Sequence, residues 1–256
     1  MNRALAFGSR NFKELTRDPL SYIFCLGFPV IMLAIMSIVN ASIPEEAGMT
    51  LFRIDKLSPG IAVFGQTFVM LFAALIVSKD RSGSFLVRMY STPMRPADFT
   101  VGYILPLMLI SVLQLIVTDI CSVITALITG AELSIAGLAV SFIVLIPSAL
   151  MFVSFGLLFG TLFSDKAAPG LCSIIISLGS FLGCIWFDAE HTGGIMYDIC
   201  RCFPFFYCTK SARSAVALDL GTDTFVIPII VVAACAAVLT LLSSAVFGAK
   251  MKADLS

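Results

Sequence analysis

Residues 135–163 read IAGLAVSFIVLIPSALMFVSFGLLFGTLF, and this run holds no charged residue. About 20 helical residues that rise ~1.5 Å each cross the ~30 Å hydrocarbon layer of a bilayer, so the run is long enough to span it. The rest of the chain has a similar character, since 59% of its 256 residues are hydrophobic and 12% are charged. A water-soluble domain usually has roughly one quarter charged residues. The sequence therefore predicts an all-α integral membrane protein, because helices satisfy their own backbone hydrogen bonds in lipid.

Six apolar stretches reach spanning length. They lie at about 20–41, 58–78, 99–129, 135–163, 168–187 and 224–248. An even number of crossings places both termini on one side, and an excess of Lys and Arg marks the cytoplasmic side. Eleven of the 16 basic residues fall on the side of the termini: Arg3, Arg10, Lys13, Arg17, Lys79, Arg81, Arg88, Arg95, Lys166, Lys250 and Lys252. We predict a single transmembrane domain over residues 1–256 with six transmembrane helices and both termini inside.

The first 19 residues have the pattern of an amphipathic helix that lies along the inner membrane surface. At 100° per residue, Arg3, Arg10 and Arg17 fall on one side. The opposite side carries Leu5, Gly8, Phe12 and Leu15, and Phe7 departs from the pattern. The alternative is an ordinary basic flank that only sets the topology.

The segment 188–223, which precedes the last predicted span, is too apolar for a simple outer loop and does not cross the membrane on its own. We therefore predict a re-entrant or interfacial outer element there. Cys200, Cys202 and Cys208 occur in it. Their spacing allows one disulfide, between Cys208 and either of the other two, and leaves one thiol over.

The inner loop 79–98 is the most informative segment outside the spans. Its centre, residues 84–90, predicts a short helix, which Pro93 ends. Three apolar side chains lie on one side of this helix and Arg88 on another; the apolar ones are Phe85, Leu86 and Met89. Such a helix is able to dock its apolar side in a groove of a soluble partner. The alternative is a solvated basic loop, which has no need of these apolar residues.

At this loop the sequence resembles the permeases of the ABC type-2 exporter family, bacterial proteins that export drugs, polysaccharides and polyketides. The resemblance rests on features in a fixed order: Pro59-Gly60 at the outer start of the second span, then Asp80-Arg81, Gly83, Phe85-Leu86 and Thr92-Pro93 in the inner loop, and Gly102 in the third span. It extends over the whole chain in the number of spans, the N-terminal helix and the long segment before the last span.

The resemblance implies a permease subunit in the cell membrane, which couples to a separate ABC ATPase subunit and pairs with a second permease copy or a paralogue. It also implies that the inner loop is the coupling helix, with contacts from Asp80, Arg81, Gly83, Phe85, Leu86, Arg88, Met89, Thr92 and Pro93. The chain has no Gly-x-x-x-x-Gly-Lys-Ser/Thr phosphate loop. We therefore expect this chain to be no enzyme and to hold no cofactor, and ATP and Mg to be bound by the partner.

Polar residues inside the predicted spans are candidates for the translocation path. Gln114, Thr118 and Asp119 belong to a polar stripe of the third span, and Gln66 and Thr67 lie in the second. An aspartate at the centre of a membrane helix needs a partner or water. The alternative is helix packing through polar side chains, since such groups also hold membrane helices together.

Small residues at helical spacing predict close helix contacts. They occur as Gly156-x-x-x-Gly160 and as Gly179-x-x-x-Gly183, the second with Ser173 and Ser177 nearby. The first pair fits contacts inside the subunit or across a dimer. The resemblance places the fifth span at the partner permease, so we assign Ser173, Ser177, Gly179 and Gly183 to the dimer interface.

Other functions leave no comparable pattern in the chain. The formal net charge is zero and basic clusters occur only beside apolar segments, so we expect membrane lipids and no nucleic acid as partners. One histidine and no HExxH motif leave a metalloprotease without its ligands. The rival hypothesis is a stand-alone secondary transporter or a membrane-embedded enzyme. The substrate class is an amphipathic or hydrophobic molecule such as a drug, a peptide or a lipid-linked molecule.

Overall fold

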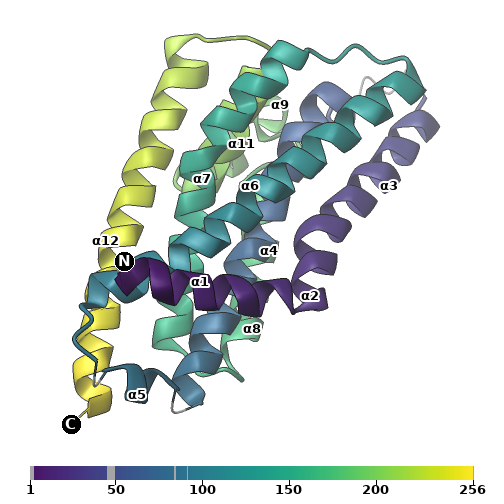
Figure 1. The fold of residues 1–256 in the computed structure, drawn as a ribbon. Helices are drawn as coiled ribbons and strands as arrows, with labels where there is room; N and C mark the ends of the chain where they lie inside the picture. The colour runs from purple at the N-terminus through teal and green to yellow at the C-terminus, as the bar shows by residue number, and fades with distance from the viewer. Residues whose placement is uncertain (1–2, 45–49, 84, 91, 256) are drawn as a thin grey trace.

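A computed structural model describes residues 3–44, 50–83, 85–90 and 92–255, and this part of the chain consists of helices and the turns between them. Five of its helices are long and apolar enough to cross a membrane. They are Pro19–Ser42, α4 (Ile54–Ser82), α6 (Pro96–Thr129), α7 (Ile135–Leu162) and Thr222–Lys252. The first contains α2 (Pro19–Tyr22), a π-helical turn (Ile23–Gly27) and α3 (Phe28–Ser42), and the last contains a π-helical turn (Thr222–Val226) and most of α12 (Ile227–Leu255). The membrane helices lie side by side as one bundle (Figure 1).

The predicted fifth span, 168–187, is shorter than expected. It forms α8 (Ala168–Leu182), and Cys184, two residues after its end, has a left-handed backbone with φ of 53°. At ~1.5 Å per residue, its 15 residues extend over ~22 Å, which is less than the ~30 Å of a bilayer core. The sequence predicted six full-length spans. The described residues contain five helices of that length and one shorter apolar helix.

The predicted outer element, 188–223, contains three helices, α9 (Ala189–Thr192), α10 (Gly194–Arg201) and α11 (Pro204–Val216). The last of these packs against α4, α7 and α12 and buries one whole side. None of the cysteines in the described part of the chain forms a disulfide, and Cys200 and Cys208 are buried as free thiols. The disulfide that the spacing allowed is absent from this structure.

The second membrane helix, α4, occupies the centre of the bundle and packs closely on α7. At Gly156 of α7, an added Cβ would overlap the backbone carbonyl oxygen of Met70 of α4. At Gly160, one turn later, it would lie 2.5 Å from the carbonyl oxygen of Ala74. Only glycine allows such an approach of two helix backbones. This glycine pair therefore acts inside the subunit, which was one of the two expected places.

The first helix, α1 (Arg3–Thr16), runs across the bundle and packs on α6 (Figure 1). Its buried residues are Phe7, Gly8, Asn11 and Leu15. The sequence pattern had placed Leu5 and Phe12 with Leu15 and had set Phe7 aside, but Leu5 and Phe12 are exposed and Phe7 is only 4% exposed. The pattern was misleading because this helix has two apolar sides, one against the bundle and one on its surface.

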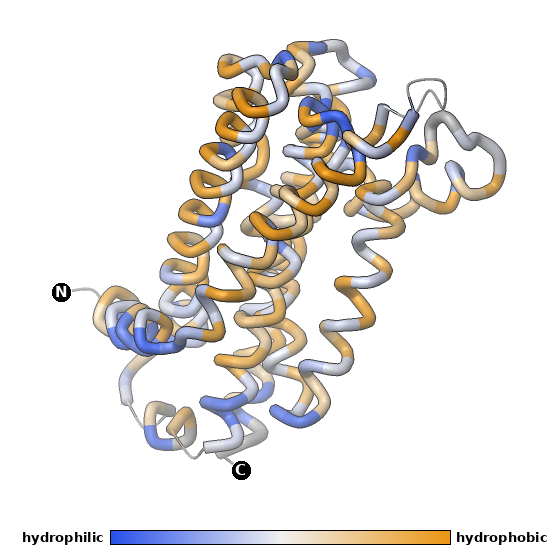
Figure 2. Tube along the Cα trace, turned by 90° about the vertical axis from the view of Figure 1, so that its right-hand side faces the viewer, coloured by the Kyte–Doolittle hydropathy of each residue, from blue (hydrophilic) through white to orange (hydrophobic). Residues whose placement is uncertain are grey.

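Hydrophobic residues predominate along the long helices, whereas hydrophilic residues gather on α1 and towards the ends of the bundle (Figure 2). A bundle with many exposed apolar side chains between two polar ends matches the environment of a bilayer. The structure thus has the distribution of residues that a multi-pass membrane protein requires.

Candidate functional site

The short helix α5 (Phe85–Tyr90) of the inner loop rests against the membrane bundle. Residue 84, which the sequence pattern placed in the same helix, lies outside the described residues. Leu86 is 1% exposed, and Phe85 and Met89 pack against the same apolar cluster. We call this group the inner cluster; its buried residues are Phe7, Val77, Leu86, Phe99, Tyr103, Leu157 and Phe247. It joins α1, α4, α5, α6, α7 and α12 at one end of the molecule.

Aromatic side chains connect α5 to α1 and α6 within the inner cluster. The ring of Phe7 stacks on Phe85 with centroids 6.4 Å apart and meets the edges of Phe99 at 5.3 Å and Tyr103 at 5.0 Å. The guanidinium of Arg10 lies 4.1 Å from the centre of the Phe85 ring. Stacked rings and a cation over a ring face add directional contacts to the burial of apolar area.

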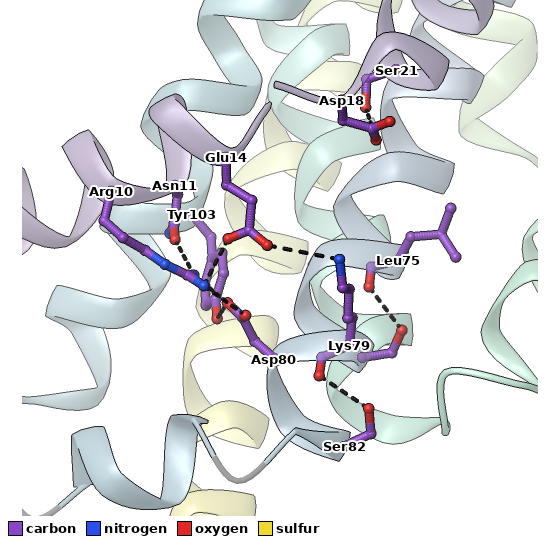
Figure 3. Close-up of polar contacts among 11 residues, drawn as sticks. Arg10, Asn11, Glu14, Asp18, Ser21, Leu75, Lys79, Asp80, Ser82 and Tyr103 are labelled. Carbon is purple, nitrogen blue, oxygen red and sulfur yellow. Dashed lines mark hydrogen bonds and ion pairs between the residues drawn. The ribbon is translucent and has the colours of Figure 1, made fainter. Parts of the chain in front are cut away.

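Asp80, near the end of α4, holds three helices together (Figure 3). Arg10 of α1 donates to its two carboxylate oxygens at 2.7 and 3.2 Å, and the Tyr103 hydroxyl of α6 donates at 2.7 Å. Asp80 is only 5% exposed. Burial of the guanidinium alone lowers the pKa of Arg10, but the hydrogen bond and the charge of Asp80 outweigh burial and raise this pKa above its usual value. The guanidinium of Arg10 therefore stays charged at neutral pH.

Three polar contacts support this pair from α1. Arg10 also forms an ion pair with Glu14 at 2.7 Å, and Glu14 lies 3.9 Å from the ammonium of Lys79 on α4. Asn11, which is 1% exposed, donates to the backbone carbonyl of Gly102 at 3.0 Å. Together these contacts fix α1 across α4 and α6.

The remaining residues of the inner loop make local contacts or reach other elements. Arg81 donates to the carbonyl oxygens of Gly160 and Thr161 at the end of α7. Gly83 ends α4, and the hydroxyl of Thr92 donates to the carbonyl of Met89 at 2.6 Å. Arg3 donates to the carbonyl of Pro93.

The structure thus divides the residues that were assigned to a docking surface. Asp80 and Arg81 form hydrogen bonds within this chain, and Leu86 is buried in it. Arg88, in contrast, is exposed on the side of α5 that faces away from the bundle. The expectation that Leu86 seats in a groove of a partner does not agree with its burial, because its own bundle already covers it. The accessible side of α5 is the one with Arg88.

The polar residues that were assigned to a translocation path lie mostly within helix packing. Gln66 donates to the carbonyl of Leu145 at 3.0 Å and accepts from the Ser148 hydroxyl at 2.6 Å, so it connects α4 to α7. Gln114 donates to Thr118 at 3.1 Å and approaches the carbonyl of Ala62 at 3.4 Å, which connects α6 to α4. These residues and Thr67 are at most 1% exposed, and Asp119 alone is partly accessible. The geometry favours the packing interpretation for the four buried residues.

A groove that the sequence patterns did not reveal runs between the first span, α4 and α8. Its polar part is a cavity of about 700 Å³ with five charged residues: Glu14, Arg17, Asp18, Lys79 and Asp165. Its apolar part is a cavity of about 430 Å³ with Phe24, Phe68 and Ile176 in its walls. The two parts share Leu20, Phe72 and Leu75. We call the two parts together the amphipathic groove.

Residues 3–217 match the sequence profile of the ABC-2 type transporter family. This match covers most of the chain. The chain belongs to the ABC-2 type transporter family. No curated protein matches it.

Membership in the ABC-2 type transporter family makes this chain a membrane transport subunit, and the five long apolar helices agree with a multi-pass membrane protein. The match extends through α11, so the inner cluster, the amphipathic groove and the buried helix α11 lie largely in the matched part of the chain.

The small residues of α8 in this ABC-2 type domain face two directions. Gly179 and Gly183 are buried, and an added Cβ at Gly179 would lie 3.7 Å from the ring of Phe205 on α11. Ser173 and Ser177 lie on the exposed side, where Phe181 is 57% exposed. The glycines therefore serve contacts inside the subunit, and only the two serines lie on a surface that a second subunit could reach.

Proposed function

We propose that this chain is the permease subunit of an ATP-driven exporter of amphipathic molecules, and that a separate ABC ATPase subunit binds ATP and Mg and drives it. The observation that carries this proposal is the placement of α5. Its apolar side is part of the inner cluster with residues of α1, α4, α6, α7 and α12, while its other side, with Arg88, is exposed. A displacement of α5 by a partner is thereby transmitted to several membrane helices at once, because packed interfaces shift as units.

The amphipathic groove is the proposed site for the substrate. Its charged part lies beside α1 and its apolar part extends along α4 and α8. A molecule with one polar and one apolar end would match both parts, because charged groups need polar partners and apolar groups gain from burial. Aromatic walls favour the same kind of molecule, since Phe24 stacks on Phe68 with ring centroids 6.3 Å apart. The location in a bacterial cell membrane belongs to this proposal.

The coupling role of α5 is tested by Arg88→Glu in the full chain, co-purified with its ATPase and reconstituted in vesicles. We expect substrate-stimulated ATP hydrolysis to fall about tenfold, which corresponds to ~1.4 kcal/mol of lost coupling, because a reversed charge on the docking side repels the partner. Insertion and the melting temperature of the permease should stay unchanged.

The matched control for this experiment is Lys13→Glu, a charge reversal at an exposed position of α1. It should leave stimulation within about twofold of the parent. Equal stimulation in the Arg88→Glu complex would remove α5 from the coupling path.

A second permease, identical or paralogous, completes the proposed transporter. We place its contact on the exposed side of α8, which carries Ser173, Ser177 and Phe181. Ser173 and Ser177 also line the apolar part of the amphipathic groove, so the test uses Phe181, which is outside that lining. Phe181→Ser should lower the dimer fraction in chemical cross-linking without lowering the melting temperature of the monomer. Gly179→Leu should instead reduce the yield of folded monomer, because its Cβ faces Phe205. A dimer that is unaffected by Phe181→Ser would contradict this placement.

A further inference from the structure

A second polar cavity lies between the first turn of α4, the turn after α8 and α11. The start of α4 and α11 lie at the other end of the bundle from α5 (Figure 1). Its volume is about 250 Å³, and the ring of Phe206 supplies an apolar wall. We call it the outer pocket; its polar lining includes Asp55, Lys56, Asp188, Thr209, Lys210 and Arg213. The proposed function assigns no role to it.

The charges of the outer pocket are mixed. Asp55, Asp188 and Asp219 supply three carboxylates, whereas the basic residues of the pocket are Lys56, Lys210 and Arg213. A simple anion would meet the carboxylates, and a simple cation would meet the basic groups. A ligand with both an ammonium and an acidic group pairs with both kinds of side chain at once.

The frame of the outer pocket is fixed by one arginine. Arg213 Nε donates to the carbonyl of Lys56 at 3.1 Å, and its Nη1 donates to the carbonyl of Cys184 at 2.9 Å. These bonds tie α11 to the start of α4 and to the turn after α8. A pocket with walls held in this way is prepared to bind before the ligand arrives, which reduces the entropy lost on binding.

A buried hydroxyl in the pocket points to a ligand. Thr209 is 1% exposed, and its Oγ1 has no hydrogen-bond partner among the residues that the structure describes. Thr224 Oγ1, on the same cavity, is in the same state. Buried polar groups are nearly always paired in folded proteins, and a hydroxyl is able both to donate and to accept. A polar ligand in the outer pocket would supply the missing partner.

We propose that the outer pocket binds a small zwitterionic group, with its ammonium near Asp55 and Asp188 and its acidic group near Lys56 and Lys210. The hydroxyl of Thr209 completes the contact. Such a group occurs both as the headgroup of phosphatidylethanolamine and as a free solute such as phosphoethanolamine. Binding at this site requires no ATPase and no transport, so the test below is independent of the proposed function.

The test measures the melting temperature of the purified full-length chain in detergent with added phosphoethanolamine, and titration calorimetry gives its Kd. Ethanolamine and inorganic phosphate serve as the two half-ligands. We expect phosphoethanolamine to bind at least tenfold more tightly than either half. Thr209→Val should weaken this binding at least fivefold, and Lys210→Gln provides a second variant if Thr209→Val lowers the yield of folded protein.

Thr129→Val is the matched control, because the Thr129 hydroxyl donates within its own helix to the carbonyl of Thr125 at 2.9 Å, away from the pocket. It should bind like the parent. Nanodiscs of phosphatidylethanolamine and of phosphatidylglycerol separate the two sources: stabilisation only by the first, lost in Thr209→Val, assigns the site to the lipid headgroup. The proposal is overturned if neither the solute nor the lipid stabilises the chain, if a half-ligand binds as tightly, or if the folded pocket variants bind like the parent.

Discussion

The helix α4 and the last span are both apolar enough to cross a membrane, but they differ greatly in environment. The most apolar 18-residue stretches of the two have mean hydropathies of 2.2 and 2.9, yet 83% of that stretch is buried in α4 and only 17% in the last span. Lipid and the interior of a membrane protein are both apolar, so hydropathy identifies a span without locating it in the bundle. The difference lies in the contacts that α4 makes. Glycines of α7 pack on one side of it, Asp80 at its end binds Arg10 and Tyr103, and Gln66 in its middle bonds to α7.

The largest effect is expected where α7 meets α4. Gly156→Leu places a side chain against the carbonyl of Met70, which packing at that distance does not admit, so we expect a loss of more than about 4 kcal/mol in stability and little folded protein. The monodisperse fraction after size-exclusion chromatography measures this. Gly170→Leu on α8 is the control, because nothing lies within 4 Å of an added Cβ there. Similar yields for both variants would mean that α4 is not the packed centre of the bundle.

A smaller loss is expected at the end of α4. Asp80→Asn removes the charge that faces Arg10, while Glu14 still offers Arg10 a partner and the pair is partly exposed on the Arg10 side. We therefore expect the free energy of unfolding to decrease by about 1–2 kcal/mol, which is less than the ~3–5 kcal/mol lost when a fully buried ion pair is broken. Thermal unfolding in detergent measures it.

The control for Asp80→Asn is Asp55→Asn at the other end of α4, where Asp55 lies 3.5 Å from Arg53 and both side chains are exposed by 36% or more. Its cost should not exceed about 1 kcal/mol. If Asp55→Asn cost as much as Asp80→Asn, the three-helix contact would not be the feature that anchors α1.

The smallest effect is expected in the middle of α4. Gln66→Leu removes the bonds to Leu145 and Ser148, and hydrogen bonds between membrane helices contribute ~0.6 kcal/mol on average. We expect the melting temperature to fall slightly while the substrate preference in vesicle transport stays the same. Asn40→Leu on the first span should change neither. A changed substrate preference in Gln66→Leu would return this residue to the translocation path.

The sequence predicted the long spans well because a long charge-free run has few alternatives to a membrane helix. For the predicted spans 135–163 and 99–129, the helix ends in the structure differ from the predicted ends by at most three residues. The short helix of the inner loop was also predicted and is confirmed as α5 over Phe85–Tyr90. The expected full span at 168–187 was wrong in length, since apolar content alone did not reveal the left-handed turn at Cys184.

The candidate site was harder to predict than the spans. The sequence identified Asp80 and Arg81 as a charged pair of the inner loop, but it did not show that their side chains bind inside this chain. Their partners lie about 70 and 80 residues away in sequence. Phe7 was set aside for the same reason: only the rings of α5 and α6 explain its burial. The amphipathic groove is formed by α1, the first span, α4 and α8, which come from separate parts of the chain, and no local pattern encodes it.

Transport by reconstituted vesicles tests most directly whether this chain is a path that another subunit drives. Vesicles with the chain and its ATPase should move an amphipathic fluorescent substrate only with ATP and Mg, and Leu75→Trp in the groove should reduce that movement while ATP hydrolysis continues. Movement of the same substrate at the same rate by the chain alone, without any ATPase, would contradict the account and favour a stand-alone transporter.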